Sequence, residues 1–206
     1  MKMKPILFNT DMVREILEGC KTVTRRAMKP QPRGHAALLT SNLLPETTEA
    51  GAGAVYAFED GTVTSPPYRP GDVLYVRETW TAWSRTYGTI PRILYKADRY
   101  TDAEKIKWRP SIHMPREAAR IFLRVTDVRA DRLWNITEEQ AKAEGLYKGW
   151  AQTETSSMAI TAKQAFMWVW DRTIKPGDLA RYGWIANPWV WVIEFDRISR
   201  EEMHRC

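Results

Sequence analysis

Cysteine and histidine are scarce in this chain, which has two cysteines and three histidines among 206 residues. Cys20 and Cys206 make neither a disulfide framework nor a set of metal ligands, and such usage is typical of a reducing compartment. His35, His113 and His204 have no paired spacing. We therefore expect no metal site, and we expect no cofactor.

Long apolar runs are also missing. No run approaches the roughly 20 residues that cross a bilayer. Residues 1–10 carry lysines but lack the apolar core of a secretory signal. We therefore expect a cytoplasmic protein with no membrane partner.

Apolar residues are nevertheless plentiful, because 44% of the chain is hydrophobic and ten residues are tryptophan. This is enough to bury a core, and the length predicts a single domain over residues 1–206 with sizeable insertions. We expect most of the tryptophans in that core. The net charge of +6 and the pI of about 9.4 favour a polyanionic partner.

The segment Gly19–Arg26 gathers cations and hydroxyls directly after a short predicted helix. Val13, Ile16 and Leu17 recur at helical spacing, residues 9–11 offer polar caps, and the glycine that opens the segment ends the helix. A helix that ends there delivers a lysine, two threonines and two arginines into a turn. This arrangement predicts a site for an anionic or polar ligand.

Residues 31–70 are rich in proline and glycine and contain a predicted hairpin. Its strands are Val55–Glu59 and Thr62–Thr64, and its turn lies at Asp60–Gly61. We interpret 31–70 as an insertion into the domain, and residues 146–160 as a second, loop-like insertion.

A strand is predicted over residues 73–78, after a Pro-Gly-Asp turn. Alternation places Glu78 on the same face as Leu74 and Val76. We expect that face to point inward, so Glu78 is a carboxylate at the edge of the core.

The second half of the chain predicts two further strands and two short helices. Thr137–Gln140 and Thr161–Gln164 each match a capping box, and the first of these helices ends at Gly145. Strands are expected over 119–128 and 189–197. The sum is an α+β fold, most simply a small barrel with short helices around it.

The order of these segments resembles the ASCH-domain family (activating signal cointegrator homology), and especially its members in bacteriophages and prophages. The resemblance implies a PUA-like β-barrel with short flanking helices and an inserted hairpin. It covers most of the chain outside 31–70 and 146–160. It rests on Gly-x-Lys-Thr-x-Thr-Arg-Arg at 19–26, Pro-Gly-Asp-Val-Leu-Tyr-Val-Arg-Glu-Thr-Trp at 70–80, Pro-Ser-Ile-His-Met-Pro-Arg at 110–116 and Asn-Pro-Trp-Val-Trp-Val-Ile-Glu-Phe at 187–195.

The family resemblance implies that the protein binds RNA or a modified nucleoside in a basic cleft beside the helix. One branch of the family is an amidohydrolase that removes the acetyl group from N4-acetylcytidine. Its site residues match Lys21, Thr24 and Glu78 of this sequence. We predict these three as base, nucleophile and acid. Members of that branch are shorter than this chain.

The predicted chemistry depends on the protonation of Lys21 and Glu78. A lysine acts as a base only when it is neutral, and Arg25 and Arg26 are expected to lower the pKa of Lys21. The reaction also requires a protonated Glu78, whose pKa burial would raise. The alternative is a Lys21–Glu78 ion pair that joins the helix to the strand.

The other candidates are binding residues in the same cleft. Arg25 and Arg26 are expected at phosphates, and Trp80 is either a core residue or a stacking platform for a base. The predicted binding residues are Thr22, Arg25, Arg26, Trp80, His113 and Arg116. Two further functions stay open: a ribonuclease that uses the same cleft, and a non-catalytic reader of RNA or other nucleic acid.

Overall fold

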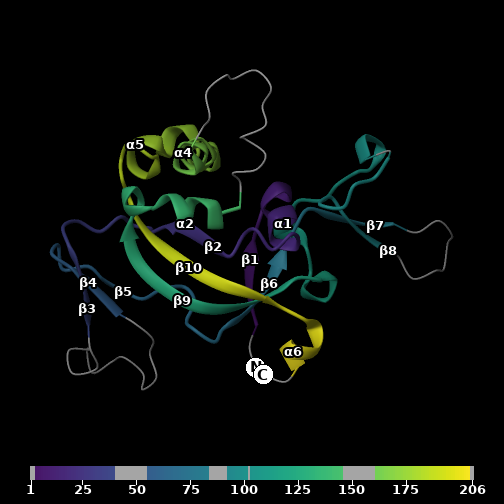
Figure 1. Cartoon of the computed structure of the whole chain (residues 1–206), viewed down its shortest axis with the longest axis horizontal. Coiled ribbons are helices and arrows are strands. Elements are labelled where there is room, and N and C mark those ends of the chain that lie inside the picture. The colour runs from purple at the N-terminus through teal and green to yellow at the C-terminus, as the bar shows by residue number, and fades with distance from the viewer. Residues whose placement is uncertain (1–2, 40–54, 84–91, 102, 146–160, 205–206) are drawn as a thin grey trace.

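The structure is a computed structural model, and it describes residues 3–39, 55–83, 92–101, 103–145 and 161–204. The central sheet has five strands in the order β1-β6-β9-β10-β2 (Figure 1). β1 runs parallel to β6, and the other pairs are antiparallel. In sheet order, the strand bounds are Lys4–Leu7, Val73–Arg77, Phe122–Arg132, Trp189–Ile198 and Val23–Ala27. The fold is α+β, as predicted, and the sheet supplies most of its core.

Helix α1 (Thr10–Leu17) packs against one face of this sheet. Its cap is Asn9, whose side chain accepts a hydrogen bond from the Met12 amide. Beyond the helix, Gly19 has a φ of 74°, a conformation that glycine adopts without strain. The predicted helix before the cation-rich segment is confirmed.

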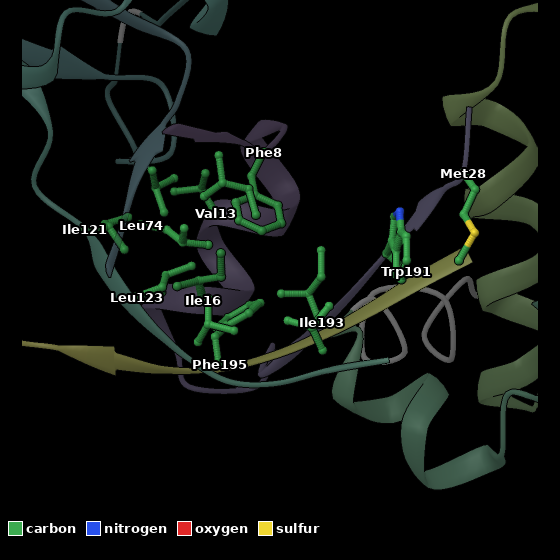
Figure 2. Close-up of a cluster of buried hydrophobic side chains, with 14 of the residues drawn as sticks. Phe8, Val13, Ile16, Met28, Leu74, Ile121, Leu123, Trp191, Ile193 and Phe195 are labelled. Atoms are coloured by element: carbon green, nitrogen blue, oxygen red, sulfur yellow. The ribbon is translucent and has the colours of Figure 1, made fainter. Parts of the chain in front are cut away.

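The main hydrophobic core lies between α1 and the sheet (Figure 2). Alternation along each strand brings one set of apolar side chains to this face. The buried residues shown there include Val13, Ile16, Leu74, Leu123, Ile193 and Phe195. The predicted inward face of the 73–78 strand is confirmed, because Leu74, Val76 and Glu78 are all buried.

The two edge strands, β1 and β2, do not pair with each other among the residues described. One side chain crosses from one edge to the other. The Arg26 guanidinium donates a hydrogen bond to the Leu7 carbonyl at 2.6 Å, and it lies 5.2 Å from the centroid of the Phe8 ring. The described strand pairs therefore form an open sheet, whose edges are joined by a side chain.

Helices cover the other face of β10 and β2 (Figure 1). The two main ones are α2 (Glu138–Ala143) and α4 (Ala162–Thr173), and both begin with the predicted capping boxes. Phe166 and Trp170 of α4 belong to the same buried cluster as Val190 and Val192 of β10. The other helices and helical turns in the described residues are η2 (Ala103–Lys105), η3 (Ser111–His113), η4 (Arg116–Ala118), η5 (Leu133–Asn135), η6 (Pro176–Asp178), α5 (Leu179–Tyr182) and α6 (Arg200–His204).

Two smaller sheets flank the central one (Figure 1). The first contains β3 (Ala36–Leu39), β4 (Val55–Phe58) and β5 (Val63–Thr64), and the second pairs β7 (Trp80–Trp83) with β8 (Arg92–Tyr95). The predicted hairpin is β4 and β5, but the sequence did not predict β3.

The predicted insertion at 31–70 contributes to the main core. The rings of Tyr56 and Trp191 have centroids 5.4 Å apart, and those of Phe58 and Trp189 lie 5.2 Å apart. The second predicted insertion, 146–160, lies outside the described residues. None of the described helices is long and apolar enough to span a membrane.

Candidate functional site

Lys21 is the most deeply buried cation of the predicted site, and its side chain has no exposed surface. Its ammonium donates to the Val23 carbonyl at 2.8 Å, to the Glu144 carbonyl at 3.0 Å and to Glu144 Oε2 at 2.6 Å. These acceptors match the three N–H bonds of an ammonium group. The residue therefore joins β2 to the end of α2.

Glu144 is shared between Lys21 and Arg25. Its Oε1 accepts a hydrogen bond from the Arg25 guanidinium at 3.1 Å, and Gln140 Oε1 accepts one from the same group at 2.7 Å. Gln140 and Glu144 are four residues apart, so successive turns of α2 bring them to one side of the helix. The result is a buried network of two cations and one carboxylate.

Burial lowers the pKa of Lys21 below its usual value of 10.5. The Glu144 carboxylate opposes this shift, whereas the charges of Arg26 and Arg25 lower the pKa further. The sequence predicts that the pKa of Lys21 is lowered and that Arg25 and Arg26 contribute to this, and both expectations agree with the environment of Lys21.

The Lys21–Glu78 ion pair, the alternative to the catalytic interpretation, is wrong. Glu78 instead forms a bidentate ion pair with Arg120, with Oε1 to Nε at 2.9 Å and Oε2 to Nη2 at 3.1 Å. Arg120 also donates to Asp98 at 3.0 Å. Burial raises the pKa of Glu78, and the hydrogen bonds and charge of Arg120 oppose that shift. The reason is topological, because β6 and β2 occupy different positions in the sheet.

A pocket of about 190 Å³ lies along β2, which is an edge strand of the central sheet. We call it the edge pocket. Its wall mixes apolar side chains of α4 with polar groups of β2 and α2. It is lined by Leu7, Asn9, Met12, Thr24, Arg25, Arg26, Glu144, Phe166, Val169, Trp170 and Thr173.

Thr24 supplies a hydroxyl to the edge pocket. The residue is 3% exposed, yet none of the described residues hydrogen-bonds its side chain. Lys21 Nζ lies on the Val23 carbonyl, which belongs to the peptide group directly before Thr24. Two neighbouring residues of β2 therefore position the two groups: Val23 binds the Lys21 ammonium, and Thr24 carries the hydroxyl.

The structure brings together some of the predicted residues. Thr24, Arg25 and Arg26 line the edge pocket, and Lys21 contacts its wall through Glu144. Thr22 lines a different hollow of about 430 Å³, which Glu139, Glu194 and Asp196 make acidic.

Trp80, His113 and Arg116 do not line the edge pocket among the described residues. Trp80 is buried in a separate cluster with Met114 and Phe122, so its core interpretation holds. His113 and Arg116 are exposed and lie in the helical turns η3 and η4. Between these two turns, the Arg77 side chain donates hydrogen bonds to the Ile112 carbonyl in η3 and to the Met114 carbonyl that follows it.

The end of α1 brings together three side chains that are able to ligate a metal. The ligand atoms of Glu15, Glu18 and Cys20 lie within 4.8 Å of one another. Histidine and cysteine spacing did not predict this group, because two of its three members are glutamates.

Glu144 is the site residue that sequence reasoning missed. The available signal was its place at the end of a capped helix, directly before Gly145 and four residues after Gln140. A Cβ at Gly145 would lie 2.9 Å from the Lys21 Cβ and 2.7 Å from the Glu15 Cβ. The glycine therefore permits the close approach of α2 to the cation-rich segment.

Comparison of the chain with protein-family models, with curated proteins and with solved structures finds no match in any of the three. The site is therefore interpreted from its own geometry and chemistry.

Proposed function

We propose that the edge pocket binds a nucleoside, either free or within RNA. Phe166 and Trp170 supply aromatic surface against which a base packs, and Arg26 supplies a cation for a phosphate or ribose oxygen. The Thr24 hydroxyl, which no described residue hydrogen-bonds, lies beside the buried Lys21–Glu144 pair, and this is the observation that carries the proposal. Under this proposal the chain is an ASCH-type protein, and its five-stranded sheet corresponds to a PUA-like barrel whose edge strands β1 and β2 are joined, among the described residues, by the Arg26 side chain instead of by backbone pairing.

The same groups support hydrolysis of an N4-acylcytosine amide, with Glu144 in the part first assigned to Glu78. Transfer of a proton along the 2.6 Å contact converts Lys21 to an amine and Glu144 to a carboxylic acid. Thr24 Oγ1 attacks the acyl carbon and gives its proton to Lys21, while the N4 leaving group takes the proton of Glu144. The products of this step are cytidine and an acyl ester on Thr24.

Water completes the reaction. The Glu144 carboxylate takes a proton from a water molecule, whose oxygen attacks the ester carbon. Thr24 Oγ1 leaves with the proton held by Lys21. The acid is released, and Lys21 and Glu144 return to their neutral forms. The net reaction consumes one water and one amide and yields one amine and one carboxylic acid.

Product analysis tests this reaction. Purified protein is incubated with N4-acetylcytidine, and cytidine and acetate are measured by mass spectrometry. We expect turnover by the native chain, loss of about a hundredfold or more in Thr24→Val, and partial activity in Thr24→Ser, which keeps a hydroxyl. Lys21→Met is expected to be inactive.

Other results would contradict the hydrolytic part. Saturable binding of cytidine without turnover identifies a non-catalytic reader. Cleavage of RNA that survives removal of contaminants and disappears in Lys21→Met identifies a ribonuclease. Absence of both binding and turnover contradicts the proposed function as a whole.

A further inference from the structure

The backbone of β2 has one side that β10 does not use. The Phe195 amide donates to the Thr22 carbonyl, and the Met28 amide donates to the Trp189 carbonyl. Because hydrogen-bonding direction alternates along an antiparallel strand, the N–H and C=O of Thr24 and Arg26 also point to β10. The backbone groups of the odd-numbered residues therefore point away from the sheet.

The Val23 carbonyl confirms this alternation, because it accepts its hydrogen bond from Lys21 Nζ rather than from β10. The next backbone groups on that side are the N–H and C=O of Arg25. No other described strand pairs with this edge of β2. An edge strand of this kind presents a donor and an acceptor to whatever lies beside it.

The edge pocket lies beside these two groups. Arg25 as a whole residue is 5% exposed, whereas its side chain is 1% exposed and is held by Glu144 and Gln140. The main chain thus supplies most of the accessible surface of Arg25, which is one of the residues that line the pocket. Because the Arg25 guanidinium already donates to Glu144 and Gln140, Arg25 offers a ligand its main-chain N–H and C=O and not its charge.

We propose that the main-chain N–H and C=O of Arg25 read the hydrogen-bonding edge of a cytosine-type base. This inference rests on the proposed nucleoside function and names its specificity-determining contact. Cytosine presents an exocyclic amine donor next to the ring-nitrogen acceptor N3, and an N4-acyl group leaves both in place. The Arg25 N–H donates to N3, and the Arg25 carbonyl accepts from N4–H. The base then lies between Arg25 and the aromatic side chains of α4.

Isotope labelling isolates the Arg25 amide. The dipeptide Thr-Arg occurs once in the sequence, at Thr24-Arg25, and Arg-Arg occurs once, at Arg25-Arg26. Protein with ¹³C-carbonyl threonine and ¹⁵N-arginine therefore gives a carbonyl-filtered NMR signal for the Arg25 amide alone. A second sample with doubly labelled arginine reports the Arg26 amide, which points to β10 and serves as the internal control.

Cytidine is titrated into both samples. We expect the Arg25 amide to shift and its hydrogen exchange to slow, while the Arg26 amide changes little. We also expect 3-deazacytidine, which lacks the N3 acceptor, and N4,N4-dimethylcytidine, which lacks the N4–H donor, to bind about tenfold more weakly or worse.

The outcomes separate this inference from the proposed function. If cytidine binds but leaves the Arg25 amide unchanged, or if 3-deazacytidine binds equally well, the backbone contact is wrong while nucleoside binding stands. If the pocket prefers a uracil or purine nucleoside over cytidine, the assigned base is wrong. If no nucleoside binds, both are overturned.

Discussion

At the scale of single residues, Lys21 makes folding depend on pH. Burial lowers its pKa in the folded protein below the usual 10.5, so between these two values the unfolded chain binds more protons. The free energy of unfolding therefore rises with pH through this window, and this contribution is lost as the pH falls from 10.5 towards the folded pKa. Lys21→Met is expected to remove that contribution, as measured by urea unfolding across the alkaline range.

The matched control is Lys142→Met, because Lys142 lies on α2 and is exposed. We expect this variant to keep the alkaline slope of the native protein. An unchanged slope in Lys21→Met would show that the folded environment of Lys21 differs from the one described.

Gly145 leaves space for the close approach of α2 to the cation-rich segment. Its φ is 90°, and an added Cβ would lie 2.9 Å from the Lys21 Cβ. Gly145→Ala is therefore expected to lower the free energy of unfolding by about 2 kcal/mol or more. Gly177→Ala serves as the control, since a Cβ added there would meet no described atom within 4 Å, and we expect a change within about 0.5 kcal/mol. Equal effects of the two variants in chemical denaturation would contradict the close packing at Gly145.

At the scale of elements, α4 forms one wall of the edge pocket through Phe166, Val169 and Trp170. Val169 is half-buried and lines the pocket, so Val169→Phe places a larger side chain into space that the fold leaves open. We expect this variant to weaken cytidine binding about tenfold or more, with a change in stability of about 1 kcal/mol or less. Isothermal titration calorimetry measures the binding.

Trp168→Phe is the control on the same helix, because Trp168 is 44% exposed and does not line the pocket. We expect cytidine to bind this variant as it binds the native chain. Unweakened binding to Val169→Phe would place the ligand elsewhere on the molecule.

At the scale of the whole molecule, Arg26 joins the two edges of the open sheet. It donates to the Leu7 carbonyl at 2.6 Å and lies over the Phe8 ring. Arg26→Met is expected to lower the free energy of unfolding by about 1–3 kcal/mol, because it removes a charge-assisted hydrogen bond and a cation–π contact. Arg92→Met, at an exposed position of β8, should change it by about 0.5 kcal/mol or less in the same denaturation assay.

The sequence predicts local features of this fold well. Thr137 and Thr161 cap their helices as predicted, and Asn9 is the cap among the three candidates at 9–11, because a cap depends on residues within one turn. Strand ends are less predictable. β9 begins at Phe122 and continues to Arg132, later at both ends than the predicted 119–128, because its pairing with β10 extends to Trp189.

The partners of buried charges were the least predictable feature. Lys21 and Glu78 both belong to a recognisable motif, yet each pairs with a residue that is distant in the sequence, Glu144 and Arg120 respectively. Which carboxylate reaches which cation depends on the strand order β1-β6-β9-β10-β2, and periodicity alone does not reveal that order. The sequence marks Glu144 as the residue at the end of a capped helix, directly before Gly145, but it does not indicate which cation lies beside that helix end.

In the proposed function, the carboxylate that acts on the substrate is Glu144 of the edge pocket and not Glu78. The most direct test compares the rate of N4-acetylcytidine hydrolysis by Glu144→Gln and by Glu78→Gln, each corrected for the folded fraction measured by circular dichroism. We predict a loss of about a hundredfold or more for Glu144→Gln and native turnover per folded molecule for Glu78→Gln. Native turnover in Glu144→Gln, or loss of turnover in folded Glu78→Gln, would contradict the assignment of Glu144 as the acid.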